Sequence, residues 1–451
     1  MKVFHLADIH LGRRRLDGRL PDSDLAGAFG FVADKAIEEK ADVVLVAGDL
    51  FDRPTVEPPH LRQAQQVLGR LKDSGIRTVA IEGNHDRAFV HSDEPTWMQF
   101  LAEDDLLVLL RTAFNSAGPM LRAWDANRKS GSWIDIDGVR FVGAGYLGAA
   151  TPYKIRQLVS RLEPDKIHVL LLHAGPDYFV GESGGFSSSD IKAISEKVCY
   201  LALGHIHQPM LYAGWACNPG SPENCDVREA TYDWGPGGIR VPRGYAVVQI
   251  DPARRHQPAD LRIHTNPRRP VHRFTLDCSP FGNKTRDGAT ALVKAAVKLI
   301  QSSGAAPQSV IDLRLSGRLN LNRIALDQAL AAHEIETQAS VFAVSIDVSR
   351  LNIAGSAKID GTSTEQFSRE DLEKLAIRAV VAEKHLLGVD HREDEFAALF
   401  YDLKESVRLQ KTGPELAEQI GQSSLLKMIY ASNALGAESL AAIAGTPEEV
   451  A

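Results

Sequence analysis

The chain has 451 residues, of which 44% are hydrophobic and 24% are charged, and its formal net charge is -7 at pH 7. This length and apolar fraction allow a sizeable core and predict two or three domains. The negative net charge argues against a protein that coats nucleic acid by electrostatic attraction alone, so binding to nucleic acid would depend on local basic groups or on metals.

The first 250 residues alternate short apolar runs with helical stretches. The runs are nearly continuous, which is typical of strands that are buried on both faces in a layered α/β core. In chain order they are KVFHLA, DVVLVA, RTVAIE, VRFVGA, HVLLLH, CYLALGH and YAVVQI. Between them, residues 23–40 and 59–74 carry apolar residues three and four positions apart and are predicted to be helices. We therefore predict an α/β domain over residues 1–252.

The sequence changes character after this domain. Residues 252–270 are rich in Pro and Arg and show no periodicity, which indicates a linker. Residues 271–353 then combine the strands VHRFTL, SVIDLRL and VFAVSIDV with helices near 289–302 and 323–332. This pattern predicts a small α+β domain.

The last part of the chain is predicted to be a helical tail. A polar segment at 355–366 leads into residues 368–451, where Glu, Lys, Leu and Ala dominate. No apolar run approaches the roughly 18–20 residues of a membrane-spanning helix, and the N-terminal segment MKVFHLADIH lacks the apolar region of a signal peptide. We therefore expect a soluble, cytoplasmic protein without a membrane partner.

Five short motifs of Asp, Asn and His each follow an apolar run. They are ADIH, AGDLFD, EGNHD, LLHAG and LGHIH, and they contain Asp8, His10, Asp49, Asn84, His85, His173, His205 and His207. Because α/β folds gather their ligands beyond the carboxyl ends of strands, we expect these side chains to converge on one crevice. Carboxylate, imidazole and amide groups form a mixed nitrogen and oxygen shell that suits manganese, iron or zinc. The set predicts two metal ions, about 3.5–4 Å apart, that promote phosphoester hydrolysis.

Other residues of similar type lack this context. Any one of these motifs alone would more often belong to the surface or the core, whereas five in order at strand ends favour a metal site. We therefore interpret His5, His60, His91 and His168 as structural. The four cysteines, Cys199, Cys217, Cys225 and Cys278, form no CxxC pair and are predicted to be buried reduced thiols without a functional role.

The five motifs resemble the calcineurin-like metallophosphoesterase superfamily, whose pattern is DxH, GDxxD, GNHD, H and GHxH in this order. The resemblance implies a four-layer β-sandwich flanked by helices. It also implies one metal held by Asp8, His10, Asp49 and His207, and a second held by Asp49, Asn84, His173 and His205, so that Asp49 bridges them. His85 would then meet the scissile phosphate, and Asp86 would be the partner that orients His85.

The segments MKVFHLADIHLG, VLVAGDLFDRP and EGNHD resemble the corresponding segments of the SbcD-type double-strand-break repair nucleases and of their archaeal and eukaryotic relatives. NPGSPEN at 218–224 is similar to their Pro-Gly-Ser-x-Glu signature. The resemblance covers residues 1–250, and beyond them it rests on a capping domain at 271–353 followed by a tail at 368–451. It implies manganese-dependent cleavage of DNA, exonucleolytic on duplex ends and endonucleolytic on single strands or hairpins. No family element maps to residues 93–140.

The same resemblance implies partners. An SbcC-type ATPase would bind the helical tail, and the nuclease would be a homodimer. The helix at 59–74 carries an apolar stripe of Leu61, Ala64, Val67, Leu68 and Leu71. This stripe either docks its equivalent in a second copy or faces the core of its own domain.

Four residues are candidate contacts to DNA. Arg13, Arg14 and Arg15 follow the first ligand pair directly and would flank the metals, where arginines can hold backbone phosphates. Ser221 lies in the Pro-Gly-Ser segment. The alternative for the arginines is a solvated loop.

The metal site alone does not determine the substrate, because the same kind of metal site serves several classes of phosphoesterase. The alternative function is the hydrolysis of small nucleotides or phosphomonoesters without DNA. A third hypothesis is a metal-loaded scaffold within an ATPase complex, against which the complete set of ligands argues.

Overall fold

The structure is a computed structural model. It describes residues 1–87, 95–180, 184–234, 239–251, 253, 257–258, 260–281, 287–319, 327–353 and 398–404. The chain divides into a compact unit of residues 1–355 and a second unit of residues 356–451. In the second unit, residues 398–404 are helical, and the rest of the predicted tail lies outside the described residues.

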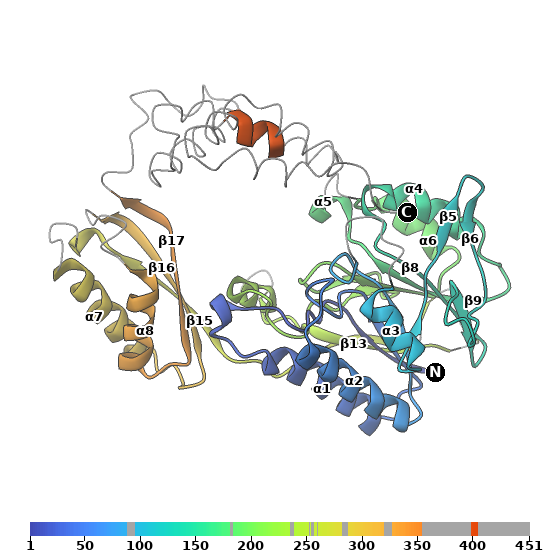
Figure 1. Cartoon of the computed structure of the whole chain (residues 1–451), viewed down its shortest axis with the longest axis horizontal. Helices are drawn as coiled ribbons and strands as arrows, with labels where there is room; N and C mark the ends of the chain where they lie inside the picture. Colours follow the sequence, from blue (N-terminus) through green and yellow to red (C-terminus); the bar gives the residue numbers. More distant parts are fainter. Residues whose placement is uncertain are drawn as a thin grey trace, which may run out of the picture. The chain divides into compact units, whose positions relative to one another are not determined.

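Two six-stranded sheets form the centre of the first unit (Figure 1). The first has the strand order β14-β13-β1-β2-β3-β4, in which β1 to β4 run parallel and β13 pairs antiparallel with β1 and with β14. Its strands are β1 (Lys2–Leu6), β2 (Val43–Ala47), β3 (Arg77–Ile81), β4 (Val108–Leu109), β13 (Gly244–Gln249) and β14 (Asp260–Thr265).

The second sheet has the order β11-β12-β10-β9-β8-β7, with a parallel centre and an antiparallel strand at each edge. Its strands are β7 (Trp133–Ile136), β8 (Val139–Gly145), β9 (Ile167–His173), β10 (Tyr200–Gly204), β11 (Met210–Tyr212) and β12 (Ala216–Asn218). A short hairpin of β5 (Ala113–Asn115) and β6 (Gly118–Met120) stands apart from both sheets.

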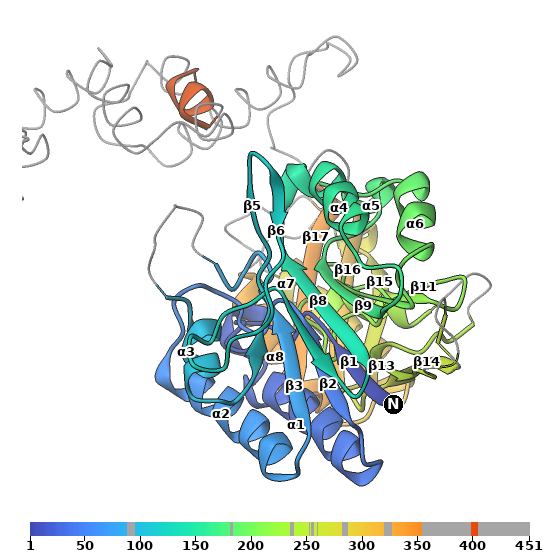
Figure 2. The same cartoon turned by 90° about the vertical axis from the view of Figure 1, so that its right-hand side faces the viewer.

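Helices cover the outer faces of the two sheets (Figure 2). One face carries α1 (Ser23–Glu38), α2 (Pro58–Asp73) and α3 (Trp97–Glu103), and the other carries α4 (Thr151–Ser160), α5 (Asp177–Val180) and α6 (Ser188–Ser195). Side chains alternate between the layers, so that Leu45 packs between the sheets whereas Val44 and Val46 pack against the helices. Burial on both faces explains why the strands read as continuous apolar runs. The predicted four-layer α/β fold is confirmed.

A small α+β domain follows, as predicted. Its parallel strands β15 (Val271–Asp277), β16 (Val310–Leu319) and β17 (Ala343–Ile353) form a sheet in the order β15-β16-β17, and α7 (Asp287–Ser302) and α8 (Gln328–Ala339) share a hydrophobic core with it. We call residues 271–353 the cap. Its β17 and α8 meet the first domain through Arg19, whose Nη1 donates to Oε1 of Glu336 at 2.7 Å and to the carbonyl of Val344 at 2.9 Å.

Two expectations about this region were wrong. The predicted linker at 252–270 contains β14, because Leu261 and Ile263 alternate with polar residues and pack against the core between the sheets. The predicted helix at 323–332 begins later: α8 starts after Asp327, whose carboxylate accepts hydrogen bonds from the backbone N–H groups of residues 329 and 330. None of the described helices is long and apolar enough to cross a membrane.

Behind the ligand-bearing strands, Arg243 is fully buried. Its Nε donates to Asp233 at 2.9 Å, its Nη1 donates to Oγ of Ser221 at 2.9 Å, and its Nη2 donates to Asn224. We expect Arg243→Met to lower the free energy of unfolding by roughly 3–5 kcal/mol, because it leaves buried partners uncompensated. Urea denaturation measures the change, and Arg262→Met, at a side chain that is 72% exposed, is the matched control. Equal stability of the two variants would contradict the prediction.

Candidate metal centre

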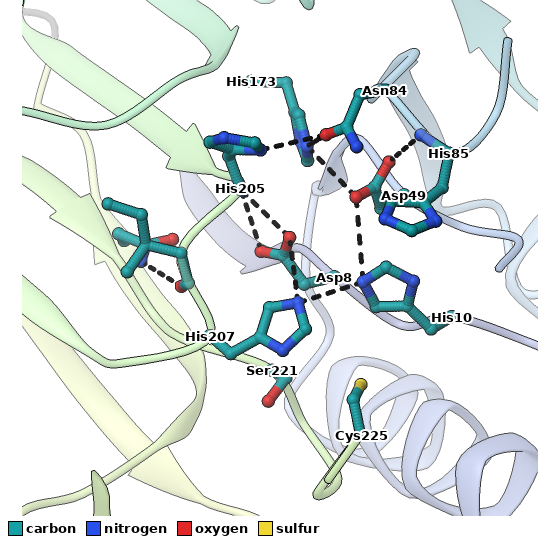
Figure 3. Close-up of polar contacts among 12 residues, drawn as sticks. Asp8, His10, Asp49, Asn84, His85, His173, His205, His207, Ser221 and Cys225 are labelled. Atoms are coloured by element: carbon teal, nitrogen blue, oxygen red, sulfur yellow. Dashed lines mark hydrogen bonds and ion pairs between the residues drawn. The ribbon is translucent and has the colours of Figure 1, made fainter. Parts of the chain in front are cut away.

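All the predicted metal ligands meet at one edge of the two sheets (Figure 3). Asp8, His10, Asp49 and Asn84 follow the parallel strands β1, β2 and β3, whereas His173, His205 and His207 lie at the ends of β9 and β10. Because parallel strands end at the same edge, the fold itself gathers the side chains. The structure thus brings together every residue that the five motifs contributed.

The first ligand set joins β1 to the second sheet. Nε2 of His10 lies 3.1 Å from Nε2 of His207 and 3.7 Å from Oδ2 of Asp49, and Nε2 of His207 lies 3.9 Å from Oδ1 of Asp8. These are the four residues that the superfamily resemblance assigns to one metal.

The second ligand set lies around Asn84. Its Oδ1 is 3.1 Å from Nε2 of His173 and 2.9 Å from Nδ1 of His205, and Nε2 of His173 is 3.2 Å from Oδ2 of Asp49. The carboxylate oxygen of Asp49 is therefore common to both sets, which suits a bridging ligand.

The backbone is strained at this edge. Asp8, His10, Asp49 and His205 have positive φ angles of 55°, 53°, 53° and 91°. Such conformations cost L-residues free energy and cluster at functional sites. Gly48 also has a positive φ, of 91°, and a Cβ there would collide with the imidazole of His173. The chain turns sharply after each strand so that consecutive side chains can point into one small volume.

The electrostatic environment of the site favours bound positive charge. Burial lowers the pKa of His173, but the charge and hydrogen bond of Asp49 outweigh it and raise the pKa to about 9. Burial also opposes charge on His207, whereas hydrogen bonds with Cys225 and Glu229 raise its pKa to about 12. Metals bind deprotonated ligands, so divalent cations would replace these protons.

The donor atoms fit that replacement. Two imidazole nitrogens, on His10 and His207, face each other at 3.1 Å, an arrangement that needs a proton or a cation between them. Burial and the charge of His173 lower the pKa of His205 to about 4, so its imidazole is neutral and available as a ligand. Asp8, His10 and Asp49 form one candidate ligand group for a metal ion, and His10 and His207 belong to another with Cys225.

His85 is fixed next to these ligands. Its backbone N–H donates to Oδ1 of Asp49 at 2.9 Å, and its Nδ1 lies 2.8 Å from the carbonyl oxygen of Asp52. A carbonyl can only accept, so Nδ1 carries the hydrogen and Nε2 is the nitrogen left for other groups. The side chain of Asp52 also lies 3.4 Å from Nδ1 of His10.

Asp86 acts on the backbone rather than on the imidazole of His85. Its carboxylate accepts hydrogen bonds from the N–H groups of Asp49 at 2.8 Å, Phe51 at 3.0 Å and Gly83 at 2.9 Å. Burial and the charge of Asp49 raise its pKa to about 7. Asp86 therefore holds the two ligand loops together, and the group that contacts the ring of His85 is the carbonyl of Asp52.

Sequence reasoning missed Glu229. Its Oε1 lies 2.7 Å from Nδ1 of His207, and its Oε2 accepts from the backbone N–H of Cys225 at 2.9 Å. A carboxylate in this position fixes the ring orientation of a metal ligand. Cys225, which had no predicted role, places its Sγ within 4.8 Å of ring nitrogens of His10 and His207. No motif in the sequence marks either residue.

Ser221 and the three arginines occupy different environments. Ser221 is buried and accepts from Arg243, so its hydroxyl faces the protein. Arg15 is also buried and bonds to the carbonyls of Asn224 and Pro21 and to Asp24.

Arg13 and Arg14 are more accessible. Arg13 donates to Asp52 at 2.9 Å and to the carbonyl of Cys225 at 3.0 Å. Arg14 has no carboxylate partner among the described residues, and with Arg53 it lines a cleft of about 570 Å³ that reaches Asp52. Arg14 is therefore the predicted DNA contact with the freest guanidinium.

The apolar stripe of α2 faces inward. Ala64, Val67, Leu68 and Leu71 are buried in the core between α1, α2 and the first sheet, and Leu61 packs against it. The stripe is thus not available to a second copy of the chain.

Residues 1–209 match the calcineurin-like phosphoesterase family. The N-terminal domain of this chain therefore belongs to the calcineurin-like phosphoesterases. That family uses a dinuclear site of divalent metal ions, and Asp8, His10 and Asp49 form a candidate ligand group in this chain.

Among known proteins, the chain is similar to archaeal DNA double-strand break repair proteins Mre11. It is 31% identical to that of Archaeoglobus fulgidus over 241 residues, which are 51% of this chain and 52% of the relative. It is 28% identical to that of Aeropyrum pernix over 219 residues, which are 47% and 50% of the two chains. The chain thus spans about half the length of the curated relatives it matches.

The shared position of Asp49 generates a prediction about metal content. Asp49→Ala should lose both metal ions, because each ligand set loses a member, whereas His85→Asn should keep them, because His85 belongs to neither set. Plasma mass spectrometry of the manganese-loaded, desalted proteins measures the ions per chain. Full metal content in Asp49→Ala would refute the bridging role.

The contact between Glu229 and His207 generates a second prediction, which concerns metal affinity. Glu229→Gln should weaken manganese binding by roughly 10–100-fold, because it removes the acceptor that orients the imidazole. Calorimetric titration with Mn²⁺ measures the affinity. The control is Asp226→Asn, whose carboxylate pairs with Arg228 at the surface. Unchanged affinity in Glu229→Gln would show that the ring needs no such partner.

Proposed function

We propose that this protein is a manganese-dependent DNA nuclease of double-strand-break repair. It would degrade duplex ends exonucleolytically and cut single strands or hairpins endonucleolytically. The observation that carries the proposal is the pair of ligand sets that share Asp49, in a phosphoesterase domain similar to proteins named for double-strand break repair. Manganese suits the mixed shell of imidazole, carboxylate and amide donors.

The residues of the site divide the chemistry between them. Two cations held by the ligand sets would withdraw charge from the phosphodiester and lower the pKa of an attacking water. His85 would offer Nε2 to the substrate, because its Nδ1–H is committed to the carbonyl of Asp52. From there it would hydrogen bond to the scissile phosphate or protonate the leaving oxygen. Asp86 would hold the loops that carry Asp49 and Gly83 in fixed relative positions during the reaction.

The arginine segment would supply contacts to DNA. In a chain of net charge -7, attraction to phosphates must come from local groups. Arg14 and Arg53 line the cleft beside Asp52, and Arg13 is partly accessible next to the same carboxylate. Arg15 and Ser221 would act by holding the loops that carry these groups.

The partners form part of the same proposal. An SbcC-type ATPase would control access of DNA to the site, and the protein would act as a homodimer. Because the apolar stripe of α2 is buried, the dimer would use other residues. The relatives' role in double-strand break repair supports an assembly on DNA ends.

The decisive experiment compares substrates. The full chain with Mn²⁺ is incubated with linear duplex, single-stranded and hairpin DNA, and separately with cyclic nucleotides and nitrophenyl phosphate. We expect cleavage of DNA, and a fall of roughly 10²–10⁴-fold in His85→Asn. Hydrolysis of the small substrates with DNA left intact would overturn the proposal in favour of a small-molecule phosphoesterase.

The environments of Arg14 and Arg15 separate binding from stability. Arg14→Ala should weaken DNA binding and reduce the slope of log K against log salt by about 1, because one phosphate contact is lost. Arg15→Ala should instead lower the free energy of unfolding by roughly 3–5 kcal/mol, because it breaks a buried ion pair. Fluorescence anisotropy and urea denaturation give the two quantities, with exposed Arg128→Ala as control. An unchanged salt slope in Arg14→Ala would exclude its contact to phosphate.

A further inference from the structure

An exposed aromatic pair lies on α5, which follows the ligand His173 after a short turn. The side chains of Tyr178 and Phe179 are 69% and 46% exposed. Their ring centroids are 5.1 Å apart, with an angle of 47° between the planes. Two exposed aromatic rings in contact form a small apolar patch, the kind of feature that can serve as a binding surface, and the proposed chemistry uses neither ring.

The turn that precedes the pair packs against the segment of His205 and His207. A Cβ on Gly175 would collide with the side chain of Ile206, the residue between the ligands His205 and His207. The backbone N–H of Asp177 donates to the carbonyl of Phe186 at 3.0 Å, and the N–H of Phe186 donates to the carbonyl of Gly175 at 3.1 Å. These contacts hold the first residue of α5 to Phe186 and place the preceding Gly175 against Ile206.

A third aromatic residue ties the pair to β11, an edge strand of the second sheet. The hydroxyls of Tyr178 and Tyr212 are 3.3 Å apart, and Tyr212 lies on β11, shortly after His207. Tyr146 adds a ring 5.4 Å from that of His205. The contact between the two hydroxyls joins α5 to β11, and α5 lies on the side of the sheets that carries α4 and α6 (Figure 2).

We propose that Tyr178 and Phe179 form a platform on which unpaired nucleobases stack while the phosphate of the same strand lies at the metal centre. This inference rests on the proposed DNA nuclease function. Every base offers a π face, so aromatic stacking binds single strands with little sequence preference. The platform residues carry no positive charge, and the carboxylate of Asp177 beside them disfavours phosphate, so the surface suits bases rather than backbone.

The platform selects for unpaired DNA. The bases of a duplex already stack on one another and present only edges to the protein, whereas a single strand or hairpin loop can place bases on exposed rings. The platform would therefore favour single-strand and hairpin substrates over blunt duplex ends.

The test compares DNA binding in two proteins that do not cleave. Tyr178→Ala/Phe179→Ala is made on the His85→Asn background, and dissociation constants are measured with Mn²⁺ by fluorescence anisotropy. We expect the dissociation constant for a short single strand to rise about tenfold, and that for a blunt duplex to change less than twofold. A strand of abasic sites, with the same phosphates but no bases, should bind both proteins equally.

Two controls separate stacking from general apolar contact. Tyr178→Phe keeps the ring and should retain single-strand affinity. Leu211→Ala removes an apolar side chain next to Tyr212 that is 51% exposed but cannot stack, so it should also retain affinity.

Each other outcome overturns the inference. Unchanged single-strand affinity in the double variant would show that Tyr178 and Phe179 do not bind nucleobases, and would indicate another partner for them, such as a protein. Equal losses for single strand, duplex and abasic strand, or an equal loss in Leu211→Ala, would indicate a non-specific apolar effect. Failure of the proposed function is distinct, because the unmodified chain would then cleave small phosphoesters but no DNA.

Discussion

The seven predicted metal ligands meet at one edge of the two sheets, and much of the surrounding structure serves to bring them together there. No single sheet edge supplies them, because the first set needs His207 from one sheet with Asp8 and His10 from the other. The two sheets are therefore pressed together over a continuous apolar core that ends at the ligands. Left-handed backbone at four ligands costs about 1–2 kcal/mol for each residue, and the packed strands behind them hold that strain.

The parts that the sequence predicted depend on local information. Each ligand motif follows an apolar run such as VVLVA before Asp49, and a strand buried on both faces requires such a run. The position of a ligand directly after a parallel strand also fixes the edge at which it lies. Fold class, the positions of the strands that precede the ligands and the convergence of the ligands could therefore be read without knowing any distant contact.

The parts that the sequence did not predict depend on contacts between distant segments. Glu229 reaches His207 across 22 positions, and nothing around it distinguishes it from a surface acid. Asp86 stands next to His85 in the sequence, yet its carboxylate turns to the backbone of Asp49 and Phe51, more than 30 positions away. β14 escaped notice because its alternation is short and lies among the Pro and Arg residues of 252–270.

The arginine segment shows how one stretch of chain serves several needs at once. It begins at the ligand His10, where Arg13 engages Asp52, a residue whose carbonyl also positions His85. It passes through buried Arg15 and ends at Arg19, which bonds to the cap. A solvated loop would leave these guanidiniums free, whereas here all but that of Arg14 anchor protein groups. The candidate metal centre and the cap are thus joined through one short loop, and the exposed guanidinium of Arg14 lies on that loop between them.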